Sequence, residues 1–150
     1  MTIAIGADHA GYLLKDEVSV WLKELGHRVL DCGTNSADSV DYSDFANAVA
    51  QAVLSGQAEL GILTCGTGLG VSMAANKIRG IRCALCNDPY SARMTREHNN
   101  ANILAMGARV IGSGVARDVM EEFLGTTFSQ DARHHRRVDK MMALENSLPS

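Results

Sequence analysis

The sequence predicts an α/β fold in which helices cover both faces of a five-stranded parallel sheet. Short apolar runs alternate with amphipathic segments of helical spacing along the chain. The runs are almost wholly apolar, as in residues 60–63, which is typical of strands buried on both faces. With 150 residues, 46% hydrophobic and 21% charged, the chain fits one domain with one core. We expect a three-layer αβα sandwich over residues 1–150 with an extra C-terminal helix.

The predicted strands and helices follow one another in regular order. Strand-like runs occupy residues 2–5, 28–31, 60–65, 81–86 and 103–106, and helical spacing predicts helices over 10–25, 42–54, 71–77, 89–98, 114–124 and 133–148. Gly26 and Gly56 follow two of these helices as C-terminal caps, and Pro89 occupies a first-turn position. This order predicts a Rossmann-like sheet whose ligands bind beyond the carboxyl ends of the strands.

The charge balance limits the partners of the chain. A formal net charge of −3 provides no overall basic field for nucleic acid or for an anionic membrane. No uncharged apolar stretch approaches the roughly 18 residues that cross a bilayer. The first 20 residues carry charges from Asp8 onward instead of an apolar signal core, so we expect a cytoplasmic protein without membrane or nucleic-acid partners.

Four cysteines in such a chain are expected to be reduced thiols: Cys32, Cys65, Cys83 and Cys86. Cys83 and Cys86 form a C-x-x-C pattern, which can indicate zinc binding or thiol redox chemistry. Residues three apart on a strand face opposite sides, however, so these two thiols cannot readily share a ligand. We expect both to be core cysteines.

The most informative segment is Cys65-Gly66-Thr67-Gly68-Leu69-Gly70, where a predicted strand gives way to a predicted helix. The glycines allow a tight turn that points several N–H groups at one spot, and a helix N-terminus adds about half a positive charge. Such a spot binds an anion, and the same field favours the thiolate form of Cys65. One loop would thus supply both a base and an oxyanion binder. The alternative is a glycine-rich turn without a ligand.

Two other functions fit this loop poorly. A dinucleotide fingerprint normally follows the first strand, whereas this loop follows the third, and Val71 stands where a small residue is expected. Asp88 has the spacing of a ribose-binding acid, but the adjacent Pro89 and the short chain argue against a nicotinamide enzyme. A cysteine phosphatase needs an arginine shortly after the thiol, and residues 66–72 contain none.

Other polar residues have both a functional and a structural interpretation. Asp8 and His9 follow the first strand, where they could serve a ligand or cap the next helix. His98 could belong to a functional site, or it could simply stabilise the C-terminus of a helix through the helix dipole. Arg133 and Arg137 are four residues apart, so on a helix they share a face that could clamp one phosphate or remain a solvated basic surface.

Longer motifs carry a resemblance to a known family. They are G-A-D-H-A-G-Y at 6–12, D-Y-S-D-F-A at 41–46, G-I-L-T-C-G-T-G-L-G-V-S-M-A-A-N-K at 61–77, N-D-P-Y-S-A-R-M-T-R-E-H-N-N-A-N at 87–102 and R-H-H-R-R-V at 133–138. Over essentially its whole length the chain resembles ribose-5-phosphate isomerase type B. The broader family also includes allose-6-phosphate and galactose-6-phosphate isomerases.

The resemblance implies an aldose–ketose isomerase of the non-oxidative pentose phosphate pathway. It would interconvert ribose 5-phosphate and ribulose 5-phosphate through an enediolate, with no redox cofactor and no metal. A six-carbon sugar phosphate is the alternative substrate. A non-catalytic module that binds a nucleotide or sugar phosphate in the same loop is the alternative of another class.

The resemblance also implies the role of each site residue. The position of Cys65 holds the base that moves a proton between C1 and C2; members with a glutamate base have it further along, where this chain has Ala74 and Ala75. The position of Thr67 relays protons between the sugar oxygens, and the loop backbone holds the enediolate. The implied catalytic residues are Cys65, Thr67, His98 and Asp8, of which the last two serve ring opening. The implied substrate-binding residues are His9, Tyr42, Gly66, Gly68, Leu69, Gly70, Asn99, Arg109, Arg133 and Arg137, with His9 and the two late arginines on the phosphate.

Finally, the resemblance implies a homodimer or a tetramer with shared active sites. His98 and one of the late arginines would come from the neighbouring subunit. A charged terminal helix beyond the last sheet unit has little core of its own to join, so we expect the helix at about 133–148 to pack on a neighbouring subunit.

Overall fold

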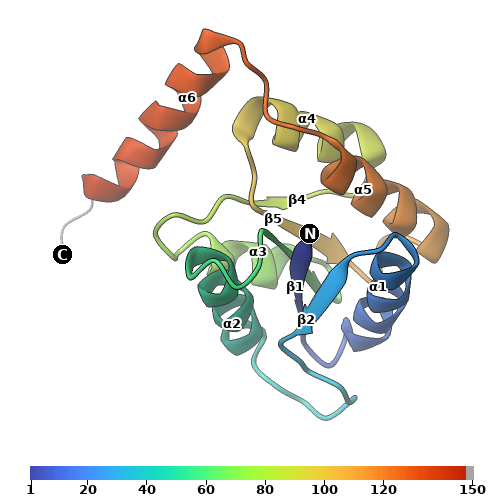
Figure 1. Cartoon of the computed structure of the whole chain (residues 1–150). Helices are drawn as coiled ribbons and strands as arrows, with labels where there is room; N and C mark the ends of the chain where they lie inside the picture. Colours follow the sequence, from blue (N-terminus) through green and yellow to red (C-terminus); the bar gives the residue numbers. More distant parts are fainter. Residues whose placement is uncertain (148–150) are drawn as a thin grey trace.

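A computed structural model describes residues 1–147 and contains a five-stranded, wholly parallel sheet (Figure 1). Its strands are β1 (Thr2–Ala7), β2 (Arg28–Asp31), β3 (Leu60–Cys65), β4 (Cys83–Leu85) and β5 (Ile103–Gly107). Their order across the sheet is β2-β1-β3-β5-β4. Ile62 of β3 lies opposite Ile5 of β1 and Leu104 of β5, so β3 occupies the middle of the sheet.

Helices cover both faces of the sheet, which confirms the expected three-layer α/β fold. The helices α1 (Tyr12–Glu24), α4 (Pro89–Asn99) and α5 (Ser113–Gly125) pack on one face, and α2 (Tyr42–Leu54) and α3 (Leu69–Ala75) on the other. The last helix, α6 (Ala132–Ala143), contacts α4 and extends away from the sheet, followed by the short 3₁₀ turn η1 (Leu144–Asn146) (Figure 1). None of the helices described within 1–147 has the length and apolar character needed to cross a bilayer.

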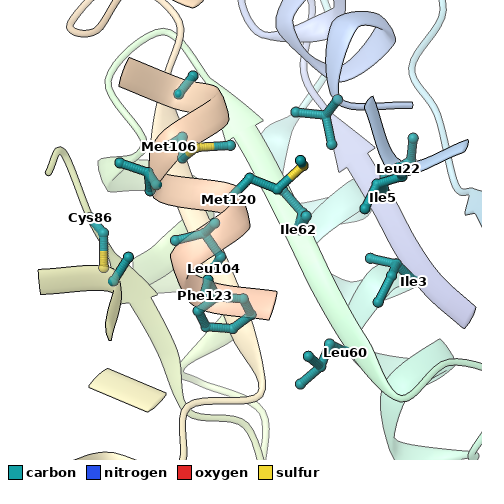
Figure 2. Close-up of a cluster of buried hydrophobic side chains, with 14 of the residues drawn as sticks. Ile3, Ile5, Leu22, Leu60, Ile62, Cys86, Leu104, Met106, Met120 and Phe123 are labelled. Atoms are coloured by element: carbon teal, nitrogen blue, oxygen red, sulfur yellow. The ribbon is translucent and has the colours of Figure 1, made fainter. Parts of the chain in front are cut away.

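The sheet separates two hydrophobic cores that differ in the size of their side chains. On the α1, α4 and α5 side, large side chains interlock: Met120 and Phe123 of α5 lie over Ile62 and Leu104 (Figure 2). Burial of each such side chain contributes about 1.5–3 kcal/mol. On the other side the core is rich in alanine, and a β-carbon on Gly61 would lie 2.6 Å from Val49 of α2. This close approach of α2 to the sheet requires glycine at that position.

Several element boundaries differ from those that the sequence predicts. The strand expected at 81–86 is paired only over Cys83–Leu85. The helix expected at 71–77 already begins at Leu69, because Gly68 has φ +78° and turns the chain sharply there. The helix expected at 133–148 ends at Ala143 and gives way to η1, and position 148 lies outside the described residues.

Candidate active site

Cys65 and Asp8 lie at the carboxyl ends of the adjacent central strands β3 and β1. The Asp8 N–H donates to the carbonyl oxygen of Thr64 over 3.3 Å, so the two strand ends are in direct contact. In the sheet, β2 lies on one side of β1 and β3 lies on the other side, so the chain crosses over β1 between β2 and β3. This is the switch point of the sheet, where parallel α/β folds bind their ligands.

The thiol of Cys65 differs from a simple core cysteine. The residue is 4% exposed and joins the apolar cluster beneath α2 and α3. Its sulfur nevertheless accepts a hydrogen bond from the Gly68 N–H over 3.1 Å. The Gly68 N–H is thus directed at the sulfur, which makes a polar contact within an otherwise apolar surrounding.

Only glycine fits at position 68. Its φ of +78° lies in the left-handed region, and a β-carbon there would overlap the Leu85 side chain and lie 3.0 Å from the carbonyl carbon of Met106. The tight turn that results directs the Gly68 N–H toward the Cys65 sulfur.

The first turn of α3 follows directly on this loop and leaves further backbone N–H groups without a helical partner. The Thr67 hydroxyl accepts from the Leu69 N–H over 3.3 Å. The first bond of the helix runs from the Ser72 N–H to the Gly68 carbonyl over 3.2 Å. The N–H groups of Gly70 and Val71 precede that bond, so they have no helical acceptor of their own.

The loop after β1 is locked onto the end of β3. Oδ1 of Asp8, a residue 7% exposed, accepts from the N–H groups of Ala10 (2.9 Å) and Gly11 (3.0 Å). The Thr64 hydroxyl donates to the Gly11 carbonyl over 2.9 Å, and a β-carbon on Gly11 would lie 2.7 Å from the backbone nitrogen of Cys65. Asp8 therefore organises the turn before α1 without capping the helix, whose N-cap is Gly11 and carries no side-chain cap, and this turn lies against Cys65.

Tyr42 and Arg109 contact the loop at 65–70, and a third predicted residue, His9, follows β1. The Tyr42 ring lies 3.0 Å from where a β-carbon of Gly70 would be, so it packs on the loop backbone. The Arg109 N–H donates to the Gly66 carbonyl over 2.9 Å, and its side chain runs alongside that glycine. His9 accepts at Nδ1 from the Val40 N–H over 3.2 Å, which joins the β1 loop to the segment before α2. One chain thus brings together Asp8, His9, Tyr42, Cys65, Gly66, Thr67, Gly68, Leu69, Gly70 and Arg109.

The other four predicted residues do not join this cluster within one chain. His98 and Asn99 end α4, which begins after β4 and returns toward the start of β5, so they lie at the opposite edge of the sheet. Arg133 and Arg137 lie on α6, which projects from the body (Figure 1). The Arg133 side chain pairs with Asp131 over 3.0 Å.

A stacked histidine pair joins α4 to α6. The rings of His98 and His134 have centroids 4.3 Å apart and an interplanar angle of 3°. His134 is 5% exposed, and burial together with the nearby His98 and Arg133 lowers its pKa. The neutral form of His134 is thereby favoured. No sequence pattern singled out His134, because its partner is 36 residues away along the chain.

The other three cysteines are free thiols, of which Cys86 is buried and Cys32 and Cys83 are partly buried. Cys83 and Cys86 belong to different hydrophobic clusters, on opposite faces of the sheet. Burial, reinforced by Asp88, raises the pKa of Cys86 to about 11, and burial raises the pKa of Cys83 as well. Burial and the adjacent Asp31 raise the pKa of Cys32.

Among residues 1–147, no three His, Cys, Asp or Glu side chains gather closely enough to hold a metal ion.

Comparisons with known proteins agree with this arrangement. A family model described as Ribose/Galactose Isomerase matches residues 3–141. Ribose-5-phosphate isomerase B of Escherichia coli is 46% identical over 95% of both chains, and a putative sugar phosphate isomerase of Bacillus subtilis is 47% identical over 97% of both. The solved structure of Clostridium thermocellum ribose-5-phosphate isomerase B superposes with a TM-score of 0.96 at 52% identity, covering 98% of this chain and 99% of that one. The chain therefore belongs to the ribose/galactose isomerase family.

Proposed function

We propose that this protein is an aldose–ketose isomerase that interconverts ribose 5-phosphate and ribulose 5-phosphate in the cytoplasm. The observation that carries the proposal is the hydrogen bond from the Gly68 N–H to the Cys65 sulfur, at the switch point of a sheet shared with ribose-5-phosphate isomerases. A protein that only binds a sugar phosphate needs no activated thiol at this position. Isomerisation does need one, because it begins with removal of a proton from carbon.

In the proposed reaction, Cys65 thiolate removes the proton from C2 of the open-chain aldose. The electron pair forms a C1–C2 double bond, and negative charge moves onto the carbonyl oxygen at C1. The N–H groups of Gly70 and Val71 are suited to stabilise that oxyanion. Thr67 transfers a proton from the oxygen at C2 to the oxygen at C1, and Cys65 returns its proton to C1. The product is the ketose, with no net gain or loss of atoms or electrons.

The remaining predicted residues would open and hold the sugar. We assign ring opening to Asp8 and His98. The phosphate would bind to His9, Arg133 and Arg137. Asn99, Arg109 and Tyr42 would contact the rest of the substrate, as would Leu69 and the glycines of the loop.

These assignments require a second copy of the chain. His98 and the two arginines lie apart from Cys65 in one chain, and α6 extends beyond the body (Figure 1). Beside the loop, apolar side chains face solvent: Tyr42 is 46%, Leu69 49% and Met73 64% exposed. We infer a homodimer, alone or paired into a tetramer, in which α6 and the end of α4 from one subunit cover the loop of the other. Such reciprocal contacts form one isologous interface.

Turnover in heavy water tests the activity. We expect ribose 5-phosphate to be converted to ribulose 5-phosphate when it is incubated with the protein in heavy water. The sugar should also acquire deuterium at C1 or C2, the carbons between which the proton moves. Cys65→Ala should abolish both while ligand binding persists, and Cys32→Ala is the matched control that should stay active. A fully active Cys65→Ala variant would contradict the mechanism. Binding without turnover by the natural sequence would instead indicate a binding module, and parallel assays with allose 6-phosphate and galactose 6-phosphate would reveal a six-carbon preference.

Mixing two inactive variants tests the shared site. Cys65→Ala disables the loop side, and Arg137→Ala disables the phosphate side. In a mixed dimer one site carries both defects and the other carries neither. After unfolding and co-refolding, half of the dimers are mixed, so we expect about a quarter of the natural activity to return. No recovery, despite mixed dimers shown by mass spectrometry, would place both residues in the site of one chain.

A further inference from the structure

Lys15 is a charged side chain enclosed within the protein. It lies on α1 and is 1% exposed. Its Nζ lies 2.6 Å from Oδ2 of Asp31 and 2.8 Å from Oδ1 of Asn35, with Asp16 at 3.4 Å. An ammonium group removed from water is costly unless it is well paired. We therefore expect Lys15 to hold Asp31 and Asn35 close to its ammonium group.

Those partners lie at the start of the segment 32–41, which joins β2 to α2. Asp31 is the last residue of β2, and its Oδ1 also accepts from the Gly33 N–H over 2.8 Å. Asn35 lies within the segment and is exposed on its outer side. Backbone bonds between Gly33 or Thr34 and Ala7 attach the first residues of the segment to the end of β1.

The far end of the same segment reaches the candidate site. Its Val40 N–H donates to Nδ1 of His9 over 3.2 Å, and Tyr42, two residues later, packs on Gly70. Because Nδ1 accepts this bond, a neutral His9 ring carries its proton on Nε2. The orientation of His9 and the position of Tyr42 thus depend on where the segment lies.

The segment has little else to hold it in its middle. Residues 34–39 read T-N-S-A-D-S, and Ser36 bonds only locally to Asp38 over 3.3 Å. Polar, exposed residues of this kind provide no apolar anchor. The bond from Lys15 to Asn35 joins this polar stretch to the body of the protein.

We propose that Lys15 is a positioning residue for the active site, holding the segment 32–41 so that His9 keeps its Nε2-protonated ring and Tyr42 stays against the glycine loop. Lys15 does not touch the substrate in this proposal; it acts through Asp31 and Asn35. The significance for catalysis rests on the proposed function, in which His9 binds phosphate and Tyr42 contacts the sugar.

Lys15→Met tests the proposal, because it keeps the length of the side chain and removes the charge. If the competent position of the segment falls to about a tenth of the population, the apparent affinity falls about tenfold. We therefore expect the KM for ribose 5-phosphate to rise about tenfold, with kcat changed less than about threefold. In the ligand-free protein, the ¹⁵N resonances of His9 should move away from the pattern of an Nε2–H ring toward a mixture of tautomers.

Asn35→Ala is the second variant, since an exposed substitution leaves the core intact. It should shift KM and the His9 resonances in the same direction by a smaller amount, while Ser39→Ala in the same segment should change neither. Unchanged His9 resonances and KM in folded Lys15→Met overturn the proposal. If Lys15→Met does not fold, unchanged His9 resonances and an unchanged KM in Asn35→Ala overturn the proposal. If the natural protein fails to isomerise ribose 5-phosphate, the proposed function is wrong, whereas the His9 resonances still decide whether Lys15 positions the segment.

Discussion

Replacement of Gly68 by alanine tests the geometry that joins the loop to Cys65. Two penalties arise at this position. The left-handed backbone, φ +78°, disfavours a β-carbon by about 1–2 kcal/mol, and the overlap with Leu85 beside the Met106 backbone adds about 1–3 kcal/mol of overpacking. Alanine also lowers the conformational entropy of the unfolded chain, which stabilises the folded protein by about 0.4–1 kcal/mol. We expect a net destabilisation of about 3 kcal/mol from these ranges.

Gly56→Ala is the matched control. Gly56 has φ +76°, and a β-carbon there would meet nothing within 4 Å, so only the backbone penalty applies. Its expected cost is about 1 kcal/mol. The difference of about 2 kcal/mol corresponds to a melting temperature about 4–8 °C lower for Gly68→Ala in a chain of this size.

Thermal unfolding followed by circular dichroism measures this difference, and alkylation of Cys65 measures its chemical consequence. A bond between an N–H and a charged sulfur is worth about 1.5–3 kcal/mol, so its displacement should slow thiolate-dependent alkylation and turnover roughly 10- to 100-fold. Gly56→Ala should leave both rates unchanged. Equal melting temperatures for the two variants would show that position 68 accommodates a side chain, and the argument from steric exclusion would be wrong.

Three further predictions follow from the packing and the charges. At pH 8, iodoacetamide should modify Cys65 well ahead of Cys86, because a pKa of about 11 leaves only roughly 0.1% of Cys86 as thiolate; peptide mass spectrometry measures this, and equal labelling would contradict it. Because the pKa of His134 is lower in the folded protein than in the unfolded chain, the unfolded chain binds more protons as the pH falls. The contribution of neutral His134 to stability is therefore complete above about pH 6.5, and it is lost as the pH falls through the pKa of His134 in the folded protein. His134→Phe should therefore reduce the fall in melting temperature between pH 7 and pH 5, and an unchanged fall would remove His134 as its source. Phe123→Ala should cost about 3–5 kcal/mol in urea unfolding while the folded variant keeps its kcat, since Phe123 is fully buried on the face away from the Cys65 thiol; a cost below about 1 kcal/mol would contradict the assignment of this ring to the core.

The arrangement of strands and helices was predictable because it depends on local patterns. Apolar runs marked all five strands, and parallel strands necessarily bring their carboxyl ends to one edge, so the neighbourhood of Asp8 and Cys65 followed from the order of elements. The end of the last helix was not predictable. It depends on η1, where the Glu145 carboxylate accepts from the Gly80 N–H over 2.9 Å, a contact between residues 65 apart.

The site was predictable only in part, for the same reason. The stack of His98 on His134 depends on the path of the chain between α5 and α6, which no local pattern encodes. The burial of Lys15 had a detectable signal: it precedes Val18 by three residues and Leu22 by seven, so it lies on the apolar face of α1. A lysine on that face calls for an acidic partner, but identifying Asp31 requires the fold.

The central position of β3 gives the two sides of the site different tolerance to mutation. Every residue of β3 is buried, so the strand that ends in Cys65 should exchange its amide hydrogens only on global unfolding. The polar segment before α2 should exchange far faster, since exposed stretches open locally at little cost. Residues 36–39, which include neither Asn35 nor Val40, can therefore accept substitutions, while the buried strand that presents Cys65 tolerates little change.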